Sequence, residues 1–329
     1  MPTSQPLPAL AAARTPLVLA PDQWQTLAEG HRARIAAFTD PIVELHHRGE
    51  KHPVHDFLFS YYSLTPGALQ RWHPGAGVVL ARSAGEGTHP DQEIPDDGPA
   101  TWRFYREVAP SDQVPQGGWE VDVEEFCERR ASMVEFGRRI LSATASRPAR
   151  LACFGLHEWA MAYRAEVHGV RHSTVPLRLG AEGTNAVVEG SRITCSHIDA
   201  FRFFAPEAVE LNELQPTRAR QVELEQPGCL HANMDLYKWA YKLLPAISSD
   251  LVADCFELAW DIRGVDMQAS PYDLADWGYE PIRIETAEGR AEYVRHRRAF
   301  AERAQELRGR LLAALDHLEA LSDDPVKLP

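Results

Sequence analysis

The sequence predicts a mostly α-helical (α+β) protein, a helical domain with a small strand element. Two observations carry this prediction. Apolar residues recur at helical spacing through most of the long segments, and only a few short segments alternate in the manner of a strand. Strands and helices do not alternate regularly, and neither a GxGxxG nor a GxxxxGKS/T motif occurs. A doubly wound nucleotide-binding fold is therefore not expected.

The composition is that of a globular protein with no membrane segment. Hydrophobic residues make up 44% of the 329 residues, and no apolar run approaches the length of a transmembrane span. The N-terminus has no cationic start before an apolar core, so no signal peptide is expected. The five cysteines are odd in number and form no CxxC pair, which predicts reduced thiols in a cytoplasmic protein.

Composition also divides the chain into one globular domain and two tails. Residues 1–20 are rich in proline and alanine and predict a flexible tail, and residues 323–329 predict a second one. The length of the remainder, 21–322, suits a single globular domain. Within it, the glycine-, proline- and aspartate-rich segment 82–99 predicts an exposed loop or insertion.

In the N-terminal half, apolar periodicity predicts helices over 22–48 and 121–145. The aromatic segment 51–72 predicts a buried helix that is broken by a proline. Short strands are expected at 78–81, a brief apolar run, and at 101–108, where apolar and polar residues alternate.

The C-terminal half begins with an apolar run that we expect to form a central helix over 151–166. Strands are expected at 175–179 and 193–204, with a polar linker at 218–227. Three later helices are expected, at 230–244, at 250–266, where apolar residues share one face, and at 287–321, a long charged segment rich in arginine, glutamate and alanine. The segment 272–284 is expected to be irregular.

Three apolar segments carry ionisable residues that packing alone does not require. They are 151–163 (LACFGLHEWAMAY), 193–204 (ITCSHIDAFRFF) and 228–241 (GCLHANMDLYKWAY), and each has a cysteine shortly before a histidine. Burying an unpaired charge is very costly, so these groups must find partners. We therefore predict that the three segments form the walls of one site, where their histidines converge.

One hypothesis for this site is a metal centre. Neutral imidazole and carboxylate are ligands of catalytic zinc and of non-haem iron, so the cluster suits a divalent ion of either metal. His231 and Asp235 are four residues apart on a predicted helix and share a face. The zincin motif HExxH is absent, because Met161 takes the place of its second histidine. The candidate ligands are His157, His197 and His231. Alternatively, these are core histidines satisfied by carboxylates and backbone carbonyls.

A second hypothesis is acid–base catalysis without a metal. The candidate catalytic carboxylates are Glu158, Asp199 and Asp235, whose pKa values burial among aromatic residues would raise. Alternatively, they form buried salt bridges, for example Asp199 with Arg202 or Asp235 with Lys238. The neighbouring thiols are open to two interpretations as well, as nucleophiles or as small core side chains.

Six segments together resemble one bacterial, largely actinobacterial, protein family whose members commonly carry the label "3-methyladenine DNA glycosylase". They are KHPVHDFLFSYYS, RWHPG, CFGLHEWAMAYR, CSHIDAFRFF, PGCLHANMDLYKWAYKL and ASPYDLADWGYEPIRIET, and the resemblance spans about residues 22–320. It implies a DNA-repair hydrolase that flips an alkylated purine into an aromatic pocket and excises it with the help of a carboxylate. The aromatic residues near the candidate carboxylates are Trp159, Tyr163, Trp239 and Tyr241.

The partner that this resemblance implies is DNA, which the net charge of −13 disfavours. A docking surface would need a local basic patch, and the last predicted helix offers one. That helix also holds many glutamates, so a solvated charged surface is the alternative. Its arginines are Arg290, Arg295, Arg297, Arg298, Arg303, Arg308 and Arg310. The alternative function is a metal-dependent enzyme, an oxidoreductase, acting on a small molecule. The substrate is then a small molecule or a nucleobase, and no membrane partner is expected.

Overall fold

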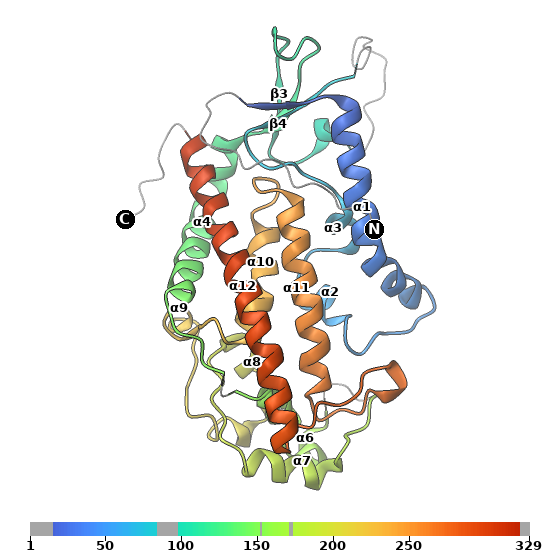
Figure 1. Cartoon of the computed structure of the whole chain (residues 1–329), viewed down its shortest axis with the longest axis vertical. Coiled ribbons are helices and arrows are strands. Elements are labelled where there is room, and N and C mark those ends of the chain that lie inside the picture. The colour runs from blue at the N-terminus through green and yellow to red at the C-terminus, as the bar shows by residue number, and fades with distance from the viewer. Residues whose placement is uncertain (1–15, 84–97, 152, 171–173, 323–329) are drawn as a thin grey trace.

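The computed structural model describes residues 16–83, 98–151, 153–170 and 174–322 of the chain. Long helices run side by side through the molecule, with a small sheet at one end and short helices at the other (Figure 1). The prediction of a mostly helical fold with a small strand element is confirmed.

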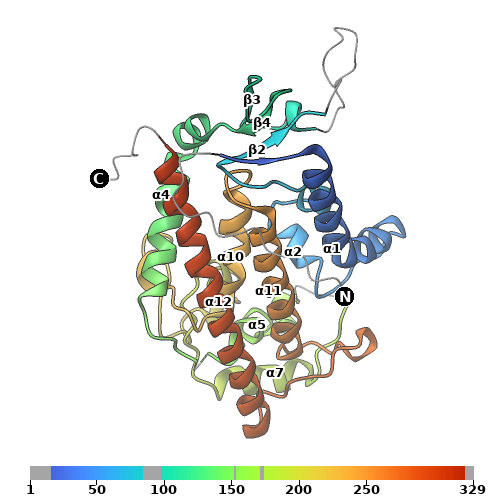
Figure 2. The same ribbon diagram turned by 45° about the horizontal axis from the view of Figure 1, so that its top comes forward.

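The sheet has four short strands: β1 (Leu17–Leu19), β2 (Val78–Ala81), β3 (Tyr105–Val108) and β4 (Gly118–Val121). Their order is β1-β2-β4-β3; β1 and β2 are parallel and the other pairs are antiparallel. Figure 2 shows the sheet lying across one end of the helices. The strand predicted at 78–81 is confirmed. By contrast, β1 lies within residues 1–20, which were predicted to be a flexible tail. These residues form a strand because their backbone pairs with β2.

Four long helices form the body of the fold: α4 (Val123–Ala145), α10 (Leu230–Lys242), α11 (Ser249–Gln268) and α12 (Ala287–Leu321). A short connection folds α10 back onto α11, and α12 packs against the other three (Figure 1). Polar side chains cap three of the N-termini, as helix starts require. The acceptors are Asp122 at α4, Ser248 at α11 and Thr286 at α12.

On the other side of α11 lies α1 (Pro21–His47), which also contacts α3 (Pro66–Gln70). The break predicted within 51–72 is present, but the helix is much shorter than expected, since the chain forms two short helices there, α2 (Phe57–Ser60) and α3. Proline starts α3 at its first position, where its missing N–H costs nothing, and the Thr65 hydroxyl accepts a hydrogen bond from the Ala68 amide.

The end opposite the sheet is built from short helices. They are α5 (Leu156–Met161), α6 (Ala165–His168), α7 (Gly180–Glu189), α8 (Ile198–Phe201) and α9 (Gln221–Leu224). Short 3-10 helices occur elsewhere in the chain, at Pro99–Thr101, Pro206–Ala208 and Ala275–Trp277. The predicted central helix is shorter than expected, because the backbone turns left-handed at Gly155 before α5 and at Arg164 after it.

The strands predicted at 175–179 and 193–204 are wrong. These segments make only isolated bridges, Leu177 with Tyr272 and Ile193 with Asn212. The Asn212 side chain accepts from the Cys195 amide at 2.7 Å and donates to the Cys195 carbonyl at 2.9 Å. One amide side chain thus does locally what a neighbouring strand would do, which frees the following residues to enter α8.

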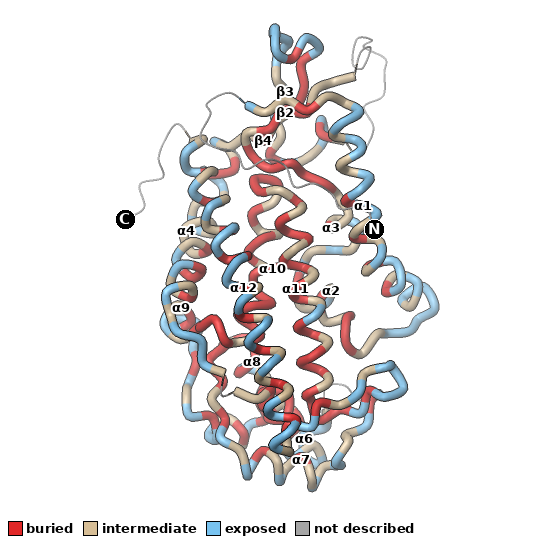
Figure 3. The backbone as a smooth tube through the Cα atoms, in the orientation of Figure 1, coloured by how far each residue is buried: buried red, intermediate tan, exposed pale blue. Residues whose placement is uncertain are grey.

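The core is centred on α10 and α11, whereas α12 exposes one face to solvent (Figure 3). Ten of the thirteen residues of α10 are buried, among them His231, Asn233 and Asp235. A helix that is buried almost all round must supply partners for every polar side chain that it carries. No helix in the described ranges has an apolar stretch long enough to cross a membrane.

The arginines of α12 are not all on the surface, which corrects the expectation of a solvated or DNA-docking face. Arg297 and Arg308 are each only 1% exposed. Arg297 donates to the carbonyls of Cys153 (2.7 Å), Arg150 (3.2 Å) and Gly228. These guanidinium groups hold the chain together instead of facing a ligand.

We expect Arg297→Ala to lower the free energy of unfolding by about 3 kcal/mol, because it removes a charged donor and leaves buried carbonyls without partners. Urea denaturation followed by circular dichroism measures this change. Arg298→Ala, at the adjacent exposed position, is the matched control and should shift stability by less than about 0.5 kcal/mol. Equal effects of the two substitutions would contradict the role given to Arg297.

Candidate functional site

The three histidines of the apolar segments converge, as the sequence predicted. His157 lies on α5, His197 precedes α8 and His231 lies in the first turn of α10. The His157 and His231 rings are 4.5 Å apart and nearly perpendicular, and the His197 and His231 rings are 5.4 Å apart. All three are buried, and His231 stands between the other two.

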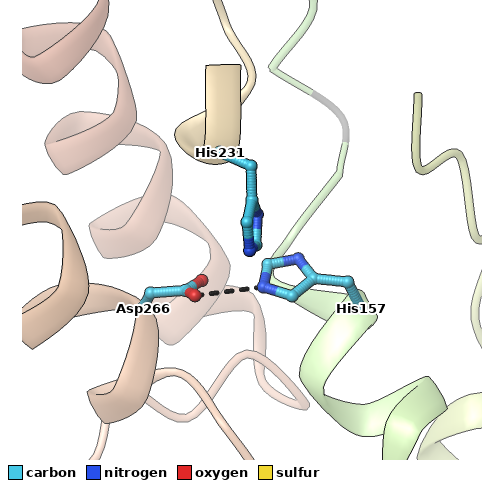
Figure 4. A group of neighbouring side chains, drawn as sticks. All are labelled: His157, His231 and Asp266. Atoms are coloured by element: carbon cyan, nitrogen blue, oxygen red, sulfur yellow. Dashed lines mark hydrogen bonds and ion pairs between the residues drawn. The ribbon is translucent and has the colours of Figure 1, made fainter. Parts of the chain in front are cut away.

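His157, His231 and Asp266 form the tighter of two ionisable groups, which we call the His–Asp cluster. One candidate ligand atom of each lies within 4.8 Å of the others. His157 Nε2 is 3.0 Å from Asp266 Oδ2, and His231 points toward this pair from α10 (Figure 4). The cluster joins α5, α10 and the C-terminal part of α11, so tertiary folding alone assembles it.

The charges in the cluster follow from this geometry. Burial opposes ionisation of both members of the close pair, but their mutual attraction outweighs it. The pKa of Asp266 therefore falls well below its usual range, and the pKa of His157 rises to about 10. Burial and the neighbouring His157 charge lower the pKa of His231. Asp266 is thus an anion, His157 a cation and His231 a neutral imidazole at pH 7.

His231 has no hydrogen-bond partner among the described residues, although it is only 7% exposed. It borders two small cavities of about 20 Å³ each, room for one water or one ion. We call the first the thiol cavity, since Cys153, Cys195 and Cys229 line it, and the second the carboxylate cavity, since Glu158 and Asp199 line it. A neutral, unpaired imidazole between two cavities is free to bind a ligand.

Buried neighbours fix the carboxylate of Asp266. Arg263 Nη1 lies 3.6 Å from Asp266 Oδ2 and 2.8 Å from Glu158 Oε1. The Tyr293 hydroxyl donates to Asp266 Oδ1 at 3.5 Å. The sequence analysis missed Arg263 and Asp266. A signal was present, because Asp266 continues the buried stripe of α11 one turn after Ile262.

The second ionisable group contains His197, Asp199 and Asp235, again with candidate ligand atoms within 4.8 Å. A cation of the chain already serves it. Lys238 Nζ contacts a carboxylate oxygen of Asp235 and lies 3.7 Å from Asp199 Oδ2. Arg218 adds a bidentate contact to Asp199, at 2.6 and 3.2 Å. This Lys238 network therefore already contains a cation of its own at the place where a metal would lie.

The rise in pKa expected for Asp199 and Asp235 is wrong. Burial alone would raise both values, but hydrogen bonding and the positive charges of Arg218 and Lys238 outweigh it, so the pKa of each aspartate is lowered. Both remain ionised at neutral pH. The suggested Asp235–Lys238 salt bridge is present. Arg202 lies 3.6 Å from Asp199, farther away than Arg218.

The four aromatic residues proposed to stack on a base do not line either small cavity in the described chain. Trp159 is fully buried and donates to the Ala269 carbonyl at 2.8 Å. The Tyr163 hydroxyl donates to Glu189 at 2.7 Å, and the Tyr241 hydroxyl accepts from the Ser63 amide at 3.3 Å. Trp239 packs beside Phe136, with ring centroids 5.6 Å apart.

The three thiols of the thiol cavity differ in character. Burial raises the pKa values of Cys195 and Cys229. Burial acts on Cys153 too, but its hydrogen bond to His157 and the charge of Arg297 outweigh it, so its pKa is lowered. Cys153 also lines a third and much larger cavity of about 830 Å³, the outer cavity.

Comparison of the chain with protein-family models, with curated proteins and with solved structures finds no match in any of the three.

Proposed function

We propose that this protein is a metal-dependent enzyme in which His157, His231 and Asp266 hold one divalent ion, iron or zinc. One observation carries the proposal: three buried ligand side chains from three separate helices converge within 4.8 Å. Two imidazoles and one carboxylate are the donor set typical of non-haem iron(II) oxidoreductases and close to that of several catalytic zinc sites. The reaction class that follows is oxidoreduction of a small molecule.

The surroundings of the cluster support this proposal. His231 is neutral and unpaired among the described residues, as a metal ligand must be. Arg263 and Tyr293 hold Asp266 in place, which is the usual task of residues behind a metal ligand. The cavities on both sides of His231 leave room for a water or a substrate atom. When bound, the metal would supply a Lewis acid or a redox centre, and Glu158 at the carboxylate cavity would accept or donate a proton.

We expect the wild-type protein to retain about one iron or zinc ion per chain after reconstitution and removal of free metal. His231→Ala should retain less than about a tenth of that amount, because only two ligands remain. Alanine favours the helix, so α10 should persist. Elemental analysis by mass spectrometry measures the ion.

His296→Ala, at a half-buried position on α12 that belongs to neither ionisable group, is the matched control and should bind metal like the wild type. A wild-type protein that holds neither iron nor zinc, or an His231→Ala variant that holds as much as the wild type, would remove the proposal.

Metal binding should release protons. Without metal, His157 carries a proton up to a pH of about 10, because its raised pKa lies far above neutrality. A metal must displace this proton, so about one proton per ion should appear at pH 7 to 8, and affinity should rise as pH rises toward 10. Calorimetric titration in two buffers of different ionisation enthalpy measures the release. Binding that releases no proton would contradict a role for His157 as a ligand.

Excision of alkylated purines, the function implied by the family resemblance, is our second candidate. The observation that favours it is the outer cavity, whose volume of about 830 Å³ would hold a nucleotide and whose lining includes four arginines. The acidic net charge counts against binding of long duplexes.

On this second candidate, the protein should release 3-methyladenine from alkylated duplex DNA, and binding should weaken steeply as salt concentration rises. Glu158→Gln should abolish release, because the carboxylate that supports the cleavage is lost, whereas Glu288→Gln on the exposed start of α12 should not. Chromatography of released bases is the measurement. No duplex binding at low salt together with no base release would sink this candidate.

A further inference from the structure

The outer cavity leads toward the His–Asp cluster. It shares four lining residues with the thiol cavity: Cys153, Thr194, Ser196 and Gln226. The shared residues form its floor, and exposed residues, including Arg150, Arg192 and Arg220, form its rim. A molecule in the outer cavity would therefore extend from the surface to the wall of the cavity that His157 and His231 line.

The rim carries positive charge that the chain does not neutralise. Arg192 forms two contacts with Glu213, one of them at 2.7 Å. Arg220 binds both oxygens of Glu223, at 2.7 and 2.9 Å. The charges of these two pairs cancel. The positive charges of Arg147 and Arg150, the other two arginines of the lining, remain.

Neither of those two arginines forms an ion pair with a carboxylate among the described residues, although Arg220 and Arg147 together lower the pKa of Glu223. Arg147 donates only to a backbone carbonyl, that of Glu225, at 2.8 Å. The side chain of Arg150 is exposed and makes no hydrogen bond or ion pair in the described part of the chain. Two cations outside any ion pair of the described residues, beside one cavity, stand out in a chain whose net charge is −13. They set a locally positive potential that attracts anions.

The floor below them is polar and partly unused. The hydroxyls of Thr194 and Ser196 have no hydrogen-bond partner within the described residues, and Ser196 is only 8% exposed. Gln226 already has partners at both side-chain atoms. Its Oε1 accepts from the amides of Arg150 (2.8 Å) and Gly228 (2.7 Å), and its Nε2 donates to the Arg150 carbonyl. The backbone of Arg150 is thereby fixed beside the cavity, which keeps the guanidinium within reach of a ligand there.

We propose that the outer cavity binds a small molecule that carries an oxyanion group, a carboxylate or a phosphate. Arg147 and Arg150 hold the oxyanion through charge-assisted hydrogen bonds, and the hydroxyls of Thr194 and Ser196 bind polar atoms nearer the floor. The volume of about 830 Å³ suits a ligand of metabolite size. The claim that this ligand is the substrate rests on the proposed metal-dependent function. The claim that the cavity binds such a ligand does not depend on that function.

Binding is tested first on metal-free protein, by calorimetric titration with inorganic phosphate and, separately, with succinate. Arg150→Gln should weaken binding of the preferred anion about tenfold, and Arg147→Gln with Arg150→Gln should abolish it. The anion that binds with the higher affinity shows whether the cavity prefers a phosphate or a carboxylate. Arg295→Gln, at an exposed position on α12, is the control. Equal affinity in Arg150→Gln and Arg295→Gln, or binding by neither anion, overturns the inference.

A second measurement uses Cys153 on the floor as a reporter. Iodoacetate is anionic and iodoacetamide is neutral, and both alkylate the same thiolate, so the ratio of their rates is independent of the thiol pKa. Peptide mapping by mass spectrometry gives both rates at Cys153. The ratio of the anionic to the neutral rate should fall severalfold in the double arginine variant and stay unchanged in Arg295→Gln. A ratio that does not respond to the rim arginines overturns the inference.

The His231→Ala variant separates this inference from the proposed function. If it loses metal but still binds the anion, both ideas stand. Anion binding by a protein that takes up no metal removes the metal-dependent function and leaves the cavity assignment intact. Anion binding that appears only with metal present places the anion on the ion, and overturns the assignment to Arg147 and Arg150.

Discussion

The structure depends on the compensation of one buried charge, the carboxylate of Asp266. It is 0% exposed, and an isolated carboxylate at such a place would cost far more than the net stability of a domain. Its partners come from three directions: His157 on α5, Arg263 one turn earlier on α11, and Tyr293 on α12. The relative positions of these helices are therefore fixed by charge pairing as well as by apolar packing.

In each of the two ionisable groups beside His231, a cation of the chain neutralises a buried aspartate carboxylate, but the two cations differ. In the Lys238 network the cation is an ammonium group tethered to α10, and the attraction of Asp235 raises its pKa in spite of burial. In the His–Asp cluster the cation is an imidazolium, whose charge is a single removable proton. Only the proton of the imidazolium can be exchanged for another cation, because the ammonium group is part of the chain. The two groups therefore differ in the cations that they can bind, although the spacing of their ligand atoms is alike.

The sequence was informative where one physical rule acts over many residues. Helical periodicity located α4, α10 and α11 to within a few residues and α12 at its observed bounds, 287–321. The rule that buried ionisable groups need partners correctly brought the three histidines together. It did not identify Asp266, because that residue ends a helix whose other acidic residues face outward. Two of these, Asp254 and Glu257, pair with Arg34.

Local pattern failed where one side chain replaced a structural element. The segment 193–204 has the composition of a strand, but Asn212 satisfies its backbone and the segment turns into α8 instead. The outer cavity was equally out of reach of the sequence. Its rim depends on which arginines form ion pairs, and that depends on three-dimensional pairing. Arg192 and Arg220 form ion pairs, whereas within the described ranges Arg147 and Arg150 form none.

The hydrogen bonds that Arg297 donates to the carbonyls of Arg150, Cys153 and Gly228 join the end of the chain to segments that precede it by about 70 to 150 residues. Those carbonyls belong to the segments that lead into α5 and α10, and their buried donor lies far downstream on α12. A chain that extends only through α11 has all three histidines but lacks the donor that these carbonyls have in the complete fold. The loops that carry the thiols and imidazoles therefore gain these three hydrogen bonds only when α12 is in place.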